Sequence, residues 1–146
     1  MKSLFVVFIF LMACSGPKDY RTEDVNLNQQ SKDNDLSMKD HHLKLKIYWL
    51  APLSGNVNVN NSLLVLVFNN NGFLVDIPEN YYLEFYATMP EMGHPMESEG
   101  YFKRIDKGIY KNENIKFTMG GFWRMELWLM NLNNEAVEQV FWDTTW

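Results

Sequence analysis

Apolar and polar residues alternate along the chain from residue 43 onward. The first alternating run, from Leu43 to Tyr48, has leucine or isoleucine at every second position and mainly lysine between them. A period of two is typical of a strand with one buried and one solvated face. The run from Ser62 to Phe68 is apolar at almost every position, which predicts a strand buried between two layers. No helical period is visible after residue 43.

Turn residues divide the rest of the chain into short extended segments. The run from Asn69 to Gly72 is the strongest turn signal, and Gly120-Gly121 and Asn133-Asn134 mark later breaks. Further strands are therefore expected at residues 73–75, 81–88, 99–105, 109–110, 114–119, 122–131 and 136–142. So many short strands, with turns about every eight to twelve residues, predict an all-β fold, an immunoglobulin-like antiparallel β-sandwich.

Residues 1–13 have the pattern of a signal peptide. Lys2 provides a positive charge, Leu4 to Phe10 form an apolar stretch, and Leu11-Met12-Ala13-Cys14 follow directly. The stretch is shorter than the ~20 apolar residues of a transmembrane helix. Leu-x-Ala-Cys in this position resembles the bacterial lipobox. That resemblance implies cleavage before Cys14 and lipidation of Cys14; the alternative is an ordinary secretory signal with an incidental cysteine.

Residues 14–42 are interpreted as the acylated cysteine and a flexible linker. This segment is rich in Asn, Gln, Asp, Lys and Ser and poor in apolar residues, so it cannot bury enough surface to fold. Residues 43–146 then form the domain. The His41-His42 pair is interpreted as solvated, with auxiliary metal capture as the alternative. Ser15, where an acidic residue would signal inner-membrane retention, favours the outer membrane facing the periplasm.

Length, charge and cysteine content narrow the function. The chain has 146 residues, 47% of them hydrophobic, which suits one domain with a substantial core. A net charge of -5 argues against a nucleic-acid partner, which requires a basic surface. The single cysteine is Cys14, so an acylated protein has neither a free thiol nor a disulfide in its domain.

The segment from Thr88 to Met96 carries the most unusual chemistry. It contains Met89, Met92, His94 and Met96, with two prolines and a glycine among them. Proline interrupts regular backbone pairing, and glycine permits a sharp turn. Thioether sulfur and imidazole nitrogen are soft or borderline donors, which select Cu(I) over hard cations. The clustering of these donors in a loop predicts a copper site.

Other chemistries fit the sequence less well. His94 is the only histidine after residue 42, and no serine lies in a nucleophile elbow, so an enzyme is not expected. Zinc requires at least three protein ligands and calcium an Asp-rich loop, and neither pattern is present. Cu(I) accepts thioethers, which do not form disulfides in an oxidising compartment.

The second half of the site is expected from a distant segment. Met119 precedes Gly120-Gly121, and two glycines allow another segment of backbone to approach closely. This turn and the segment from Thr88 to Met96, called the Met/His loop below, could therefore meet at one end of a sandwich. Met119 is therefore the predicted distal ligand, whereas Met125 lies in an alternating strand and is assigned to the core. Trp123 is a candidate site cover through a cation–π contact, with packing in the core as its alternative role.

A family resemblance rests on three spaced motifs: Met89-Pro90-x-Met92-Gly93-His94, then Gly108-x-Tyr110, then Met119-Gly120-Gly121-x-Trp123. Together they resemble the YtkA-like domains, related to FixH-like proteins, over roughly residues 49–129. These are small bacterial envelope domains with an immunoglobulin-like β-sandwich, associated with copper handling near cytochrome oxidase assembly. By this resemblance Met89, Met92, His94 and Met119 are ligands with Trp123 adjacent, while Met96 and the double glycine are local variants.

These observations predict a membrane-anchored periplasmic lipoprotein that is not an enzyme. It is expected to carry or buffer Cu(I) through the Met/His loop, as a metallochaperone does, with a copper-accepting envelope protein as partner. The alternative is a non-metal protein-interaction module. In that case the exposed Met/Pro loop is a contact surface, because methionine-rich surfaces adapt to varied partners.

Overall fold

The structure is a computed structural model that describes residues 35–146. Its regular elements are all strands: β1 (Asp35–Met38), β2 (Leu43–Trp49), β3 (Asn61–Asn69), β4 (Tyr81–Met89), β5 (His94–Pro95), β6 (Phe102–Asp106), β7 (Ile109–Ile115), β8 (Phe122–Asn131) and β9 (Ala136–Thr145). Within residues 35–146, no helix is long and apolar enough to cross a membrane. The predicted signal peptide and Cys14 lie outside the described residues.

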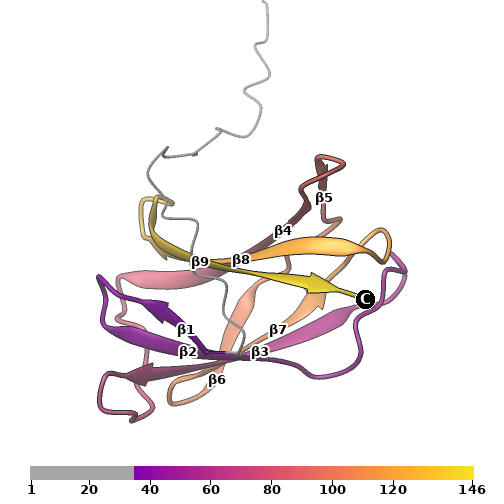
Figure 1. Cartoon of the computed structure of the whole chain (residues 1–146). Coiled ribbons are helices and arrows are strands. Elements are labelled where there is room, and N and C mark those ends of the chain that lie inside the picture. The colour runs from indigo at the N-terminus through magenta and orange to yellow at the C-terminus, as the bar shows by residue number, and fades with distance from the viewer. Residues whose placement is uncertain (1–34) are drawn as a thin grey trace, which may run out of the picture.

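The strands form two antiparallel sheets that lie one above the other (Figure 1). The first sheet has the order β1-β2-β3-β7-β6, and the second has the order β5-β4-β8-β9. Neighbouring strands pair antiparallel throughout both sheets. The predicted all-β fold, an antiparallel β-sandwich, is confirmed.

The core lies between the two sheets and follows the period-two pattern of the sequence. On β3 every second residue is buried, and Leu63, Val65 and Val67 have no exposed surface. On β8 the same alternation buries Trp123 and Met125 completely. Successive side chains of a strand point to opposite faces, so one face of each strand builds the core.

Several elements differ from the prediction. β1 lies within the segment assigned to the linker, so residues 35–38 belong to the fold rather than to the linker. β7 is continuous through polar residues 111–114, where the sequence predicted a break, and residues 116–121 form no strand. The outer face of β3 is only half-buried rather than covered by a second layer.

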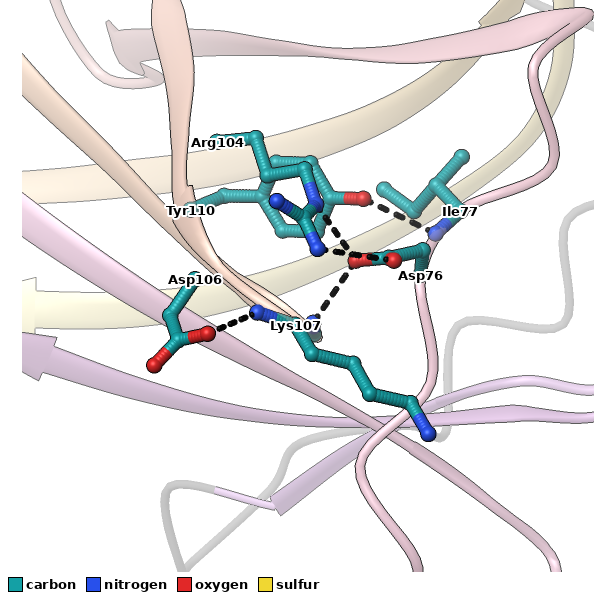
Figure 2. A network of polar contacts seen from close by, with 7 residues as sticks. Asp76, Ile77, Arg104, Asp106, Lys107 and Tyr110 are labelled. Carbon is teal, nitrogen blue, oxygen red and sulfur yellow. Dashed lines mark hydrogen bonds and ion pairs between the residues drawn. The ribbon is translucent and has the colours of Figure 1, made fainter.

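The segment that leads into β4 is fixed by a polar network around Asp76 (Figure 2). The Asp76 carboxylate accepts hydrogen bonds from Arg104 Nε at 2.8 Å, Arg104 Nη2 at 3.0 Å and the Gly108 amide at 2.8 Å. The neighbouring Ile77 amide donates to the Tyr110 hydroxyl at 2.9 Å. These bonds tie the chain before β4 to the β6–β7 hairpin of the other sheet and so determine where β4 begins.

The Asp76 network gives the fold a specific pH dependence. Hydrogen bonds from Arg104 and then from Gly108 lower the pKa of the Asp76 carboxyl below 3.8. A lowered pKa stabilises the fold at pH values above the unfolded pKa, and this contribution is lost as the pH falls through the folded value. We therefore expect Asp76→Asn to lower the unfolding free energy by a constant amount from about pH 5 to 7. That difference should shrink below about pH 4 in urea titrations. A difference that is unchanged at pH 2 would contradict the network.

Gly108 provides a test of the same junction. Its φ is +66°, and an added Cβ would lie 2.9 Å from both the Val67 carbonyl oxygen and the Val75 amide nitrogen. Gly108→Ala should lower the unfolding free energy by at least about 2 kcal/mol, because backbone strain and a steric clash combine. Gly72 is the matched control, since its φ is +80° and no atom lies within 4 Å of its added Cβ. Gly72→Ala should cost about 1 kcal/mol in the same denaturation series, and equal losses would argue against the clash.

Candidate metal centre

β4 carries Met89 to the inner face of the second sheet, at the end of the sandwich. The buried positions of β4 are Leu83, Phe85, Ala87 and Met89, and Met89 is the last residue of the strand. The next residue, Pro90, cannot continue the pairing as a donor. Met89 is therefore a core-facing side chain at the sandwich end, 6% exposed.

The hairpin after β4 returns His94 and Met96 to the same face. β5 pairs with β4 so that Met89 is opposite His94 and Thr88 is opposite Pro95. The Met96 amide then donates to the Ala87 carbonyl at 3.0 Å, which continues the register. Directly opposite residues of an antiparallel pair share a face, with Cβ atoms roughly 5 Å apart. Met89, His94 and Met96 therefore share the inner face of this hairpin, labelled β4 and β5 in Figure 1.

The segment around the double glycine approaches this hairpin through Met89. A Cβ added to Gly121 would lie 2.7 Å from the Met89 methyl carbon, so the tip of the thioether side chain rests on the Gly121 backbone. On the next strand, Trp123 precedes Arg124, which pairs with Thr88. The predicted meeting of the Met/His loop with the Met119–Trp123 turn therefore occurs at one end of the sandwich.

Met92 and Met119 are near this end of the sandwich, but their side chains are more exposed. The Met92 amide donates to the Met89 carbonyl at 3.1 Å, while its side chain at the tip of the hairpin leaves the residue 56% exposed. Met119 is 38% exposed, and its carbonyl accepts a hydrogen bond from Trp123 Nε1 at 3.2 Å. Met89 is thus the one buried side chain among the predicted ligands, while His94 and Met96 are partly exposed and Met92 and Met119 are exposed.

Trp123 lies in an aromatic cluster that closes the sandwich beneath the site. It is fully buried, its ring is 5.0 Å from Phe117, and it stacks on Trp146 at 6.1 Å with an interplanar angle of 17°. The Gly121 amide donates to the Trp146 carbonyl at 3.0 Å. The sequence did not predict a role for Trp146, because no hydrophobic pattern or motif links the last residue to a turn 25 positions earlier. Its indole Nε1 and the Thr118 hydroxyl are buried without a hydrogen-bond partner among the described residues.

The donors at this end fit a soft cation better than a hard one. Within residues 35–146, no three His, Cys, Asp or Glu side chains gather as a metal site would require. His94 Nδ1 lies 3.1 Å from the Pro95 carbonyl. A carbonyl only accepts, so this contact requires a proton on Nδ1; in the tautomer that meets this requirement, Nε2 would carry the lone pair that can bind a metal ion. A thioether and a neutral imidazole on one face are suitable ligands for Cu(I).

The histidine pair before β2 has a different environment. His41 Nδ1 is 2.8 Å from Glu138 Oε2, and the His41 ring packs edge-on against Tyr81 at 4.9 Å. These contacts join the β1–β2 turn to β9 and β4 of the other sheet. His41 therefore has a structural role at this junction rather than the solvated position expected from the sequence.

Comparisons with known proteins support the fold. No protein-family model and no curated protein matches the sequence. Among solved structures, the chain is similar to FetP of uropathogenic Escherichia coli, expressed in the periplasm, with a TM-score of 0.52, 12% identity, and coverage of 78% of this chain and 93% of that one. A copper-bound Glu-to-Gln variant of Campylobacter jejuni P19 gives 0.52, 9% identity, and 78% and 94% coverage. A copper-bound Glu-to-Gln variant of FetP gives 0.50 at 13% identity, with 78% and 94% coverage. At these identities the similarity shows a shared β-sandwich fold.

Gly121→Ala tests the contact between the two segments of the site. The added methyl group would overlap the end of the flexible Met89 side chain, and φ of +140° is unfavourable for alanine. We expect the methyl resonance of Met89 to shift in spectra of methyl-labelled methionine. Gly93→Ala is the control, because its φ of +60° carries similar strain but nothing lies within 4 Å of the new Cβ. An unchanged Met89 resonance in Gly121→Ala would contradict the proximity of these segments.

Proposed function

We propose that the domain binds Cu(I) at the end of the sandwich where the β4–β5 hairpin meets residues 119–121. The observation that carries the proposal is the direct cross-strand pairing of Met89 with His94. This register holds one thioether and one imidazole on the same face without cysteine. Met96, which follows on that face and packs against the core, is the nearest additional ligand.

Met92 and Met119 complete the proposed ligand set from the solvent side. Their side chains are 56% and 38% exposed, so each can rotate toward an ion that enters from solution. The resulting site would have the buried Met89 thioether on one side and the more exposed Met92 and Met119 thioethers on the other. Such an arrangement favours ligand exchange over permanent retention, which suits a protein that carries or buffers copper rather than one that catalyses a reaction. Trp123 would act mainly by holding the Met119 backbone through its indole hydrogen bond.

Two further lines support a copper function in the bacterial envelope. Copper-bound variants of FetP and P19 have a similar sandwich fold. The YtkA-like motifs and the lipobox pattern of residues 11–14 are consistent with a periplasmic protein anchored through acylated Cys14. We propose that the protein is attached to the outer membrane, faces the periplasm, and passes copper to an acceptor protein. Cytochrome oxidase assembly is the role that the family resemblance suggests.

A non-metal interaction module is the alternative, and one observation favours it. Met92 is among the more exposed large apolar residues, and it lies at the tip of a hairpin that carries Pro90 and Pro95. An exposed, adaptable methionine at such a tip is suited to contact with a protein partner. In that case Met89 and Met96 would serve only to pack the hairpin against the core.

A competition titration with a chromogenic Cu(I) chelator distinguishes the two functions. We expect one Cu(I) per chain, and His94→Ala or Met89→Leu should weaken binding at least tenfold, about 1.4 kcal/mol, because each removes a donor. Met92→Leu should also weaken binding if the hairpin tip closes over the ion. Met125→Leu is the matched control, since Met125 is fully buried in the core and leucine conserves its volume.

The titration also has an outcome that favours the alternative. Folded wild-type protein that binds Cu(I) no more tightly than micromolar would support the interaction module. Equal affinities of Met89→Leu and Met125→Leu would show that Met89 is not a ligand.

A further inference from the structure

The outer face of β3 is apolar and has no layer of protein above it. Its inward residues are fully buried, whereas Leu64, Leu66 and Phe68 on the opposite face are only half-buried. The two sheets pack their buried faces against each other, so this face lies on the outside of the sandwich. A sheet face in contact with water usually carries polar residues. The partly exposed apolar residues of β3 therefore form a candidate contact surface for something outside residues 35–146.

Lysines border this apolar column on the neighbouring strands. On β2, Lys44 pairs with Phe68 and Lys46 pairs with Leu66. On the other side of β3, Lys111 pairs with Leu64, and Lys103 of β6 is opposite Lys111. Paired residues share a sheet face, so four lysines surround the three apolar side chains. Two acidic residues offset part of this charge: Glu113 forms an ion pair with Lys111 at 2.6 Å, and Asp35 of β1 pairs with Lys46.

The outer face of the second sheet has the opposite character. Its register places Glu84 on β4, Glu126 on β8 and Asp143 on β9, while its single cation, Arg124, is bound to Asp143 at 3.0 Å. The net charge of -5 is therefore unevenly distributed over the domain. Only the first sheet combines an apolar centre with a basic border. Long lysine side chains can direct their charges outward from an apolar surface, as they do at membrane interfaces.

We propose that the outer face of the first sheet rests on an anionic lipid bilayer. This inference depends on the proposed lipid anchor but not on copper binding. About 20 residues separate Cys14 from β1, and the flexible linker expected from the sequence would have an end-to-end distance of ~25 Å at that length. The chain enters the fold at β1, the edge strand of this same sheet. The anchor would therefore keep the lysine-bordered outer face of the first sheet, called the basic face below, close to the membrane surface. Anionic headgroups would complement the lysines of this face.

A second copy of the chain fits this face less well. Two copies packed through it about a twofold axis would bring the lysines of one copy against those of the other. Contact between the basic face of one copy and the acidic face of another would not close and would extend into a filament. An anionic bilayer complements both features of this face, because its hydrocarbon region can cover the apolar centre and its headgroups can pair with the lysines at the border.

Amine labelling of the full acylated chain on vesicles tests the proposal. The chain is reconstituted on vesicles of phosphatidylcholine alone or with 30% phosphatidylglycerol, and the acetylation rate of each lysine is measured by mass spectrometry. Lys44 and Lys103 should react at least threefold more slowly on the anionic vesicles, and 0.5 M NaCl should abolish the difference because salt screens the attraction. Equal rates at Lys44 on both vesicles would overturn the proposal.

Two variants and one control separate this inference from its alternatives. Leu66→Gln should reduce the protection of Lys44 from acetylation on anionic vesicles. Val137→Gln, at an exposed apolar position of β9 on the other sheet, should leave that protection unchanged. Near-ultraviolet circular dichroism confirms that both variants fold. Flotation with neutral vesicles tests the lipid anchor separately from the attraction of the basic face to anionic lipid. A chain that floats with neither lipid mixture would overturn both the lipid anchor and this inference. The labelling and flotation results are independent of copper binding.

Discussion

The alternation of side chains along β4 is the constraint on which the site depends. Because Leu83, Phe85 and Ala87 point into the core, Met89 at the end of the strand must point inward as well. The hairpin then returns in a register that places His94 on the same face. A slip of one residue would turn both donors outward.

The absence of cysteine from the domain determines what this site can do. Thioether and imidazole ligands do not need to lose a proton at neutral pH, and they resist the oxidation that would convert two thiols to a disulfide. Met89 is held by the core and the Gly121 backbone, while Met92 and Met119 remain partly exposed. In the proposed site, one side would thus be preorganised, and the other could yield the ion to an acceptor protein. With the basic face of the first sheet on the membrane, the hairpin would stay accessible from the periplasm.

The sequence was sufficient to locate the central strands and insufficient to locate β1 and β5 at the sheet edges. β2, β3, β4 and β8 follow clear apolar patterns, and their predicted positions agree with the structure to within one or two residues. β1 has only Leu36 and Met38 as inward residues, and β5 is two residues long and contains proline, so neither gives a periodic signal. β7 is polar in its centre because the buried Asn112 amide donates to the Glu99 carbonyl at 2.8 Å, a tertiary contact that local pattern does not reveal. For the candidate site, residue type alone singled out Met89, Met92, His94, Met96 and Met119, which stay predictions. The packing of Trp146 beside the double glycine could be seen only in the fold.

X-ray absorption at the copper edge of the Cu(I)-loaded protein shows whether Met89 and His94 bind the ion together. We expect a first coordination shell of two or more sulfur atoms and one imidazole nitrogen. His94→Ala should remove the imidazole contribution and leave the sulfur contribution in place. A shell of nitrogen and oxygen atoms only, or an imidazole contribution that persists in His94→Ala, would contradict the pairing of Met89 with His94 as the basis of the site.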